Sequence, residues 1–374
     1  MQLPIDIKAL FNEVTDIEKA RSTELSVSVY IDNQAQADLI AHVRGVFASQ
    51  SPTVRLTLSY LDSNFMPHEG DDMAIIVAGP SLGIGAAAAA LRAMGIPVMV
   101  VTASPVAVAQ AAQQRGFAVP EADLVYPIAE DGAEEPLPLS DEVIRKLDER
   151  MGRWVVAIAH DKRLAMAIAF PFMRRSLAKE SVQTTSIQNA GIGLVPIIPG
   201  ADLPIMTLNQ AKMVLQIAAA YGQDMDKSRA KELAAVVGGA YLFRVVAREL
   251  VEFVPVLGFV IKPGIAYGGT AAVGNAAIEY YEGGQDAAGI RNVISRATEV
   301  STKFVSDVRT KGPNAVPGLW EKLQGLQDYV PMVQDAVKEY VPVAQEAVKE
   351  YAPKVAKVVN NLVSNVVAAS STSK

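Results

Sequence analysis

The first 150 residues alternate between two hydrophobic patterns. Short runs rich in β-branched residues are separated by stretches whose apolar residues recur every three or four positions. Residues 5–20 have helical spacing with interspersed charges and are expected to form a lead-in helix. Strands are predicted at 25–31, 54–61, 73–79, 97–103 and 123–128, and helices near 34–48, 83–95, 105–116 and 140–151. Alternating strands and helices require crossover connections, so we expect a three-layer α/β domain with a parallel sheet.

Longer apolar stretches follow from residue 151. Residues 181–201 and 263–278 contain no charged residue. The first of these stretches could cross a hydrocarbon layer of about 30 Å as a helix. Its prolines and glycines favour a broken or re-entrant segment instead, which a membrane tolerates only where protein covers it. These residues predict a hydrophobic, all-α domain over 151–290.

A long helix is predicted within this domain at 202–222. Asp202 is placed to act as its N-cap, and Gly222 is the expected end. Asn209, Lys212 and Gln216 recur at spacings of three and four, so they form one narrow polar stripe on an otherwise apolar cylinder. Such a helix needs an apolar surround, which neighbouring helices or lipid would supply.

The C-terminal part contains an internal repeat. Tyr329, Tyr340 and Tyr351 are eleven residues apart, and a proline follows each of them at a constant spacing. Eleven residues make three helical turns, so each unit returns to nearly the same face. The repeat predicts an amphipathic helix that prolines bend into short pieces. It would lie on a lipid surface, pack on the protein's own helices, bind a partner, or form a loosely ordered tail. The predicted domains are 1–22, 23–150, 151–290 and 291–374.

Composition narrows the classes of function. Hydrophobic residues make up 50% of the 374 residues and charged residues 20%, which is borderline between soluble and membrane-linked proteins. The chain has no cysteine and three widely separated histidines, so disulfides and thiolate metal sites are excluded and no cofactor or metal is expected. A net charge of −6 argues against a nucleic-acid partner. The N-terminus lacks the pattern of a secretory signal.

Phosphate-binding residues are missing where this architecture usually has them. The loop after the first strand reads IDNQAQADLI and lacks the glycines, lysine and hydroxyl of a P-loop. One glycine-rich turn, at 79–85, remains as a weak candidate anion site formed by Ser81, Gly83 and Gly85. A structural role, a tight turn before a closely packed helix, is favoured for it. Residues 130–140 are acidic and contain prolines, and they are interpreted as a solvated linker before a helix that begins at Ser140.

Two resemblances extend this interpretation. The order of elements in 23–150 resembles a small GTPase domain of the Era type, but Asp62 and the segment 102–105 lack that family's motifs, which implies a pseudo-GTPase. ADLPIMTLNQAKMVLQIAAAYG and GGTAAVGNAAIEYYEGG resemble the GTPase-associated, YcjF-type family of uncharacterised helical domains of inner-membrane proteins. The matching positions are Asp202, Gln210, Tyr221, Gly222, Thr270, Gly274 and Tyr280. The resemblance implies a helical, membrane-linked domain and no known reaction.

The same positions have an ordinary structural interpretation, which is favoured over a substrate site. Asp202 would cap a helix, Gln210 would bond across a helix interface, and the glycines would allow close packing. We therefore expect a non-catalytic scaffold or regulator associated with the cytoplasmic face of the inner membrane. Its partners would be membrane lipid or a membrane protein, with a protein partner or homo-oligomer as a further option. The alternatives are a divergent nucleotide-binding protein that uses 79–85 and a soluble helical adaptor.

Overall fold

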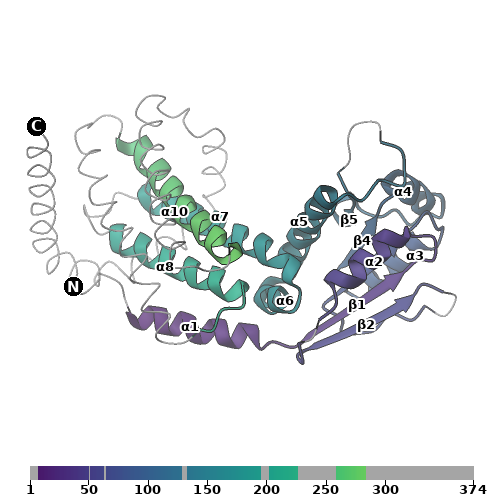
Figure 1. Cartoon of the computed structure of the whole chain (residues 1–374), viewed down its shortest axis with the longest axis horizontal. Coiled ribbons are helices and arrows are strands. Elements are labelled where there is room, and N and C mark those ends of the chain that lie inside the picture. Colours follow the sequence, from purple (N-terminus) through teal and green to yellow (C-terminus); the bar gives the residue numbers. More distant parts are fainter. Residues whose placement is uncertain are drawn as a thin grey trace, which may run out of the picture. The chain divides into compact units, whose positions relative to one another are not determined.

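The computed structural model describes residues 7–49, 51–62, 65–128, 133–194, 202–225 and 258–283 (Figure 1). The chain divides into two compact units. The first, here called the α/β unit, comprises Asp16–Glu180 and Ala219–Gln223. The second unit comprises Met1–Thr15, Ser181–Ala218 and Asp224–Lys374. The predicted eleven-residue repeats and the apolar runs between 226 and 257 lie outside the described residues.

The α/β unit contains a five-stranded sheet in which every pair of neighbouring strands is parallel. The strand order is β2-β1-β3-β4-β5, with Leu25 of β1 paired with Val54 of β2, and Val27 of β1 paired with Met73 of β3. All five predicted strands are confirmed, with bounds β1 Leu25–Ile31, β2 Val54–Tyr60, β3 Met73–Ala78, β4 Val98–Thr102 and β5 Leu124–Val125. The parallel α/β fold expected from the alternating pattern is therefore present.

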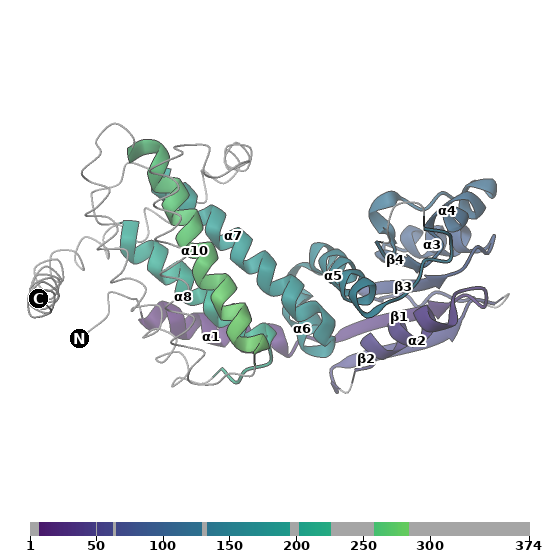
Figure 2. The same ribbon diagram turned by 45° about the horizontal axis from the view of Figure 1, so that its top comes forward.

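Helices cover both faces of this sheet, as Figures 1 and 2 show. Apolar residues of α2 and α5 pack on the face formed by the odd-numbered residues of β1 and β3. Those of α3 and α4 pack on the opposite face. The helices of this unit are α2 Ala37–Val46, α3 Ile84–Ala93, α4 Pro105–Gln114, η1 Glu121–Asp123, α5 Asp141–Ile158, η2 His160–Lys162, α6 Arg163–Ala169 and η3 Pro171–Met173.

Burial explains why the strands differ in pattern. The central strand β3, MAIIVA, is buried at every position because helices cover both of its faces. The outer strand β2, VRLTLSY, instead alternates apolar and polar residues. Its apolar positions face the side of α2, while Arg55, Thr57 and Ser59 lie on the side where, among the described residues, a connecting loop takes the place of a helix. Phe65 of that loop packs edge-on against Tyr30, with ring centroids 4.9 Å apart.

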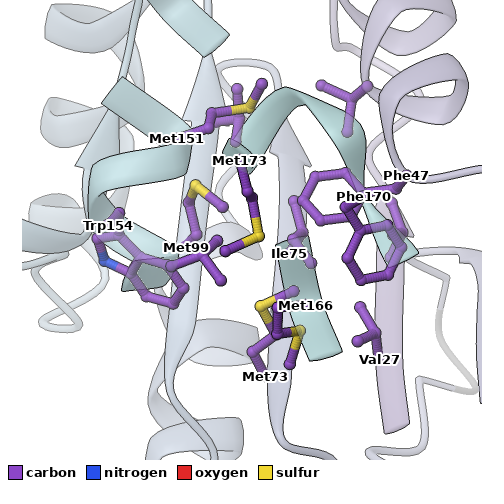
Figure 3. Packing of buried hydrophobic residues seen from close by; sticks show 14 of the residues in the cluster. Val27, Phe47, Met73, Ile75, Met99, Met151, Trp154, Met166, Phe170 and Met173 are labelled. Atoms are coloured by element: carbon purple, nitrogen blue, oxygen red, sulfur yellow. The ribbon is translucent and has the colours of Figure 1, made fainter. Parts of the chain in front are cut away.

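The core on the α2 side is rich in methionine and aromatic residues (Figure 3). Phe47, which directly follows α2, packs edge-on against Phe170, with a centroid separation of 5.2 Å. Residues from 151 to 177 contribute a large share of this core, namely Met151, Trp154, Val155, Val156, Ala165, Met166, Ala167, Ala169, Phe170, Met173 and Leu177. The unit thus runs to Glu180, and the domain boundary predicted at 150 lies inside it.

Four longer helices contribute residues to the second unit: α1 Ile7–Arg21, α7 Arg174–Leu194, α8 Asp202–Ala220 and α10 Gly258–Glu282. The lead-in helix is confirmed in α1. Helix α8 begins at Asp202 and ends just before Gly222, whose φ of 78° fits the left-handed position that follows many helices. Residues 181–194, predicted to start a broken segment, continue α7 as regular helix. None of the helices within the described residues is long and apolar enough to cross a membrane.

Candidate functional site

The carboxyl edge of the sheet between β1 and β3 is the first place to look for a ligand site. In a doubly wound sheet of order 2-1-3-4-5, the direction of winding reverses between β1 and β3, and ligands bind in the crevice outside that edge. The loops that leave these two strands are residues 32–36 and 79–83. Both loops lie within the part of the chain that the structure describes.

Asp32 binds these two loops to each other. Its carboxylate is 5% exposed and accepts a hydrogen bond from the buried N–H of Gly79, at 2.9 Å, and one from the N–H of Gln34, at 3.3 Å. The backbones meet so closely that a Cβ added to Gly79 would lie 2.2 Å from the carbonyl carbon and oxygen of Gln34. One N–H group of each loop is therefore bonded to a carboxylate of the chain and is not open to an anion.

The predicted anion turn leads directly into α3. Ser81 donates its N–H to the carbonyl of Gly79 at 2.8 Å, and α3 begins at Ile84 after Gly83. A Cβ on Gly85 would lie 2.1 Å from the carbonyl oxygen of Phe117, so this glycine lets the helix pack closely. Gly83 has no atom within 4 Å of its added Cβ and is exposed. Of the three predicted residues, Gly85 has a packing role, and the half-buried Ser81 and the exposed Gly83 belong to the turn before α3.

The N-terminus of α4 is occupied by a carboxylate of the chain itself. Glu135 accepts hydrogen bonds from the N–H groups of Val106, at 2.7 Å, and Ala107, at 3.1 Å. Leu137 is buried and donates its N–H to the carbonyl of Ala103 at 2.7 Å. The described part of the acidic segment, 133–140, therefore packs against the sheet edge. Five of these eight residues are exposed, in agreement with a solvated linker, while Glu135 and Leu137 attach the segment to the start of α4 and to Ala103.

Ser140 begins α5 as predicted. It is the N-cap of that helix, and its side chain accepts from the N–H of Val143 at 3.5 Å. In the first turn of the helix, a hydrogen bond from Lys146 holds the pKa of Glu142 below its ordinary value, and the positive charge of Lys146 acts in the same direction. Both contacts belong to the surface of α5 and stabilise its first turns.

A second candidate site is a buried polar cluster in the second unit. Thr270 of α10 accepts hydrogen bonds at Oγ1 from Nε2 of Gln210, at 2.7 Å, and from Nδ2 of Asn189, at 3.0 Å. Its hydroxyl donates to the carbonyl of Ala266 at 2.8 Å. Asn209 donates to Oδ1 of Asn189 at 3.0 Å. Gln210 and Thr270, 60 residues apart in the sequence, thus meet in one buried network that joins α7, α8 and α10.

Gly274 provides close packing one turn beyond Thr270. A Cβ at this position would lie 2.3 Å from Cγ2 of Val182 in α7 and 3.1 Å from Cε of Met213 in α8. The same three helices that share the polar cluster therefore touch at Gly274. Contacts of this kind use small residues and side-chain hydrogen bonds to hold helices together.

The remaining motif residues lie elsewhere. Tyr221 and Gly222 follow α8, where Gly222 lies near the guanidinium of Arg174. Burial lowers the pKa of Arg174, and the nearby Tyr221 acts in the opposite direction. Tyr280 packs edge-on against Tyr281, with a centroid separation of 5.0 Å. Asp202 is the first residue of α8.

Helix α1 covers the predicted polar stripe of α8. Glu13 accepts a hydrogen bond from Nε2 of Gln216 at 2.8 Å and forms an ion pair with Lys212 at 3.3 Å. Asn209, the third member of the stripe, bonds to Asn189 instead. The stripe is therefore used in helix packing within the second unit.

Sequence reasoning did not single out Asp32, Glu135 or Asn189. Asp32 follows β1 directly, and Asn189 is one of few amide side chains in the uncharged stretch 181–201, so each carried a weak signal. No sequence signal pointed to Glu135, because its role depends on where its loop meets α4. Among the described residues, no group of three or more His, Asp or Glu could hold a metal ion.

The α/β unit is therefore a doubly wound, parallel α/β fold. The second unit contains packed helices that share a buried network of amide and hydroxyl groups. No protein-family model, no curated protein and no solved structure matches the chain.

Proposed function

We propose that this protein is a non-catalytic scaffold or regulator that associates with the cytoplasmic face of the inner membrane. The observation that carries the non-catalytic part is the arrangement at the carboxyl edge of the sheet. Asp32 occupies the N–H of Gly79, and Glu135 occupies the first donors of α4. Groups that would otherwise receive a phosphate are bonded within the chain.

The helical part of the proposal rests on the second unit. Its motif residues Gln210, Thr270 and Gly274 are used in helix packing and leave no nucleophile or acid/base pair among them. Together with the uncharged stretches 181–201 and 263–278, they support a hydrophobic, all-α domain of the YcjF type behind a degenerate GTPase-like domain. The amphipathic repeat of 291–374 would add contact with a lipid surface.

A soluble helical adaptor is the second candidate, and the packing of α8 favours it. Lys212 and Gln216 are held by Glu13 of α1, and the apolar positions described along α8 are buried within the chain itself. A helix covered in this way does not need lipid around it. In this candidate, the partner would be a protein that binds an outer surface of the molecule.

Flotation with anionic phospholipid vesicles separates the two candidates. The full-length protein should rise with the vesicles and remain with membranes when cells are fractionated without detergent. Recovery of a dispersed protein that stays at the bottom of the gradient would overturn the membrane assignment and favour the adaptor.

Calorimetry with GTP, ATP and dinucleotides tests the non-catalytic assignment independently. We expect no heat of binding for any of them. Saturable binding that is lost in Gly83→Val would overturn the proposal, because the turn before α3 would then be a working phosphate site.

A further inference from the structure

The outer edge of β2 pairs with no other strand among the described residues, where β2 pairs with β1 alone. Leu25 donates its N–H to the carbonyl of Thr53 at 2.9 Å, and Leu61 donates to Ile31 at 2.8 Å, so the odd-numbered residues of β2 face β1. Backbone groups alternate in direction along a strand. Leu56, Leu58 and Tyr60 therefore direct their N–H and C=O groups outward.

This edge lacks the features that prevent strands from pairing. The strand contains no proline and no lysine, and it pairs with β1 over seven residues without a bulge. Its one charged residue, Arg55, bonds to Ser26 of β1 at 2.9 Å, to Thr57 of β2 at 3.2 Å and to Asp71, so the guanidinium is held over one face of the sheet. Leu58 and Tyr60 are 39% and 52% exposed at this edge.

We infer that β2 pairs antiparallel with β2 of a second copy of this chain, forming a continuous ten-stranded sheet in a two-fold symmetric dimer. The sequence of β2 is compatible with pairing to a second copy of itself. When the two-fold axis passes through Thr57, Leu56 lies opposite Leu58 and Val54 opposite Tyr60, where the Val54 carbonyl can accept from Tyr60 while the Val54 N–H stays bonded to Ser51 at 3.2 Å. Arg55 lies opposite Ser59, so the one charge of the strand never meets its own copy.

The backbone geometry agrees with this register. Leu56 and Leu58 both point outward, so the two copies exchange N–H···O bonds between these residues, as a hydrogen-bonded antiparallel pair requires. Thr57 then forms a non-hydrogen-bonded pair with Thr57 of the second copy. In such a pair the Cα atoms are about 4.5 Å apart, which lies within the range that a disulfide spans.

Single-cysteine variants of the full-length protein test the register, because the native chain has no cysteine. Under mild oxidation, Thr57→Cys should form a covalent dimer, visible on a non-reducing gel, at least tenfold faster than Ser59→Cys. Both residues are half-buried on the same face of β2. In the proposed dimer, the two copies of residue 59 are four positions apart, about 13 Å, which is too far for a disulfide.

Sedimentation velocity gives a second measurement. The unmodified protein should sediment as a dimer at micromolar concentration, and Thr57→Lys should shift it to a monomer because two ammonium groups, each next to an Arg55 guanidinium, would face each other on the axis. Mixing Thr57→Asp with Thr57→Lys should restore the dimer. A monomeric unmodified protein, or equal crosslinking of the two cysteine variants, would overturn the proposal. Circular dichroism of each variant shows whether it is folded.

Discussion

At the scale of single residues, glycine positions show where two backbones must touch. Gly79 and Gly83 belong to the same turn after β3, yet their surroundings differ completely. A Cβ on Gly79 meets the backbone of Gln34, whereas a Cβ on Gly83 meets nothing within 4 Å. Their sequence context is similar, so only the fold distinguishes them.

This contrast predicts opposite effects of two alanine substitutions. Gly79→Ala should lower the free energy of unfolding by about 3 kcal/mol, because the clash is with backbone that cannot move without breaking the Asp32 bonds. Gly83→Ala should leave stability unchanged or raise it by up to about 1 kcal/mol, because its φ of −82° suits alanine. Urea unfolding measures both. Equal effects would contradict the close approach of the two loops.

Thr270 predicts a second contrast at this scale. Thr270→Val removes an acceptor shared by Gln210 and Asn189 and should lower the free energy of unfolding by about 2–3 kcal/mol. Gln210→Met should cost no more than about 1 kcal/mol, because it removes a bond but also removes the buried Oε1, which has no hydrogen-bond partner. Thermal unfolding of the two variants and of the double variant gives the interaction free energy between Thr270 and Gln210. A larger loss in Gln210→Met would show that the network is arranged differently.

At the scale of elements, the hydrophobic pattern located strands and helices well. Runs such as LSVSVYI and MAIIVAG predicted β1 and β3 within a residue of their bounds. The second run is apolar throughout because β3 is buried on both faces, whereas Ser26 and Ser28 alternate with apolar residues in β1. The pairing of Gln210 with Thr270 was not predictable in detail. Spacing along one helix shows that a polar residue is buried, but its partner on another helix depends on how the helices cross.

Helix α10 predicts a matched pair of glycine substitutions. Gly274→Ala should lower the free energy of unfolding by about 2 kcal/mol, because its methyl group would overlap Val182 of α7. Gly269→Ala, in the same helix, meets nothing within 4 Å and should raise stability by up to about 1 kcal/mol through helix propensity. Thermal unfolding of the full-length protein compares them. Destabilisation by Gly269→Ala would mean that α10 packs through a different face.

At the scale of the whole molecule, neither compact unit is one continuous piece of sequence. The α/β unit includes residues 219–223, which are the end of α8 and the turn after it, and the second unit includes Met1–Thr15. Composition placed a boundary at 150 because the chain becomes strongly apolar there. Pattern alone could not show that the apolar residues from 151 to 177 cover the sheet, since a helix needs the same apolar face whether it packs on a sheet or on other helices.

This organisation predicts different behaviour for two fragments. Residues 16–180 should fold when expressed alone, with a cooperative thermal transition. Residues 16–150 should instead bind the dye ANS and lack near-ultraviolet dichroism, because Met73, Ile75 and Met99 lose the cover of Trp154, Met166 and Met173. Well-folded behaviour of the shorter fragment would show that residues 151–180 are dispensable for the sheet.

The Glu135 carboxylate at the start of α4 has a consequence for evolution and design. A doubly wound protein usually gains affinity for a phosphate compound by acquiring glycines and a basic side chain in its loops. Here such substitutions alone would not suffice, because the first N–H groups of α4 already donate to the Glu135 carboxylate. Converting this corner into a binding site would also require replacing Glu135, so that the N–H groups of Val106 and Ala107 become available to a phosphate.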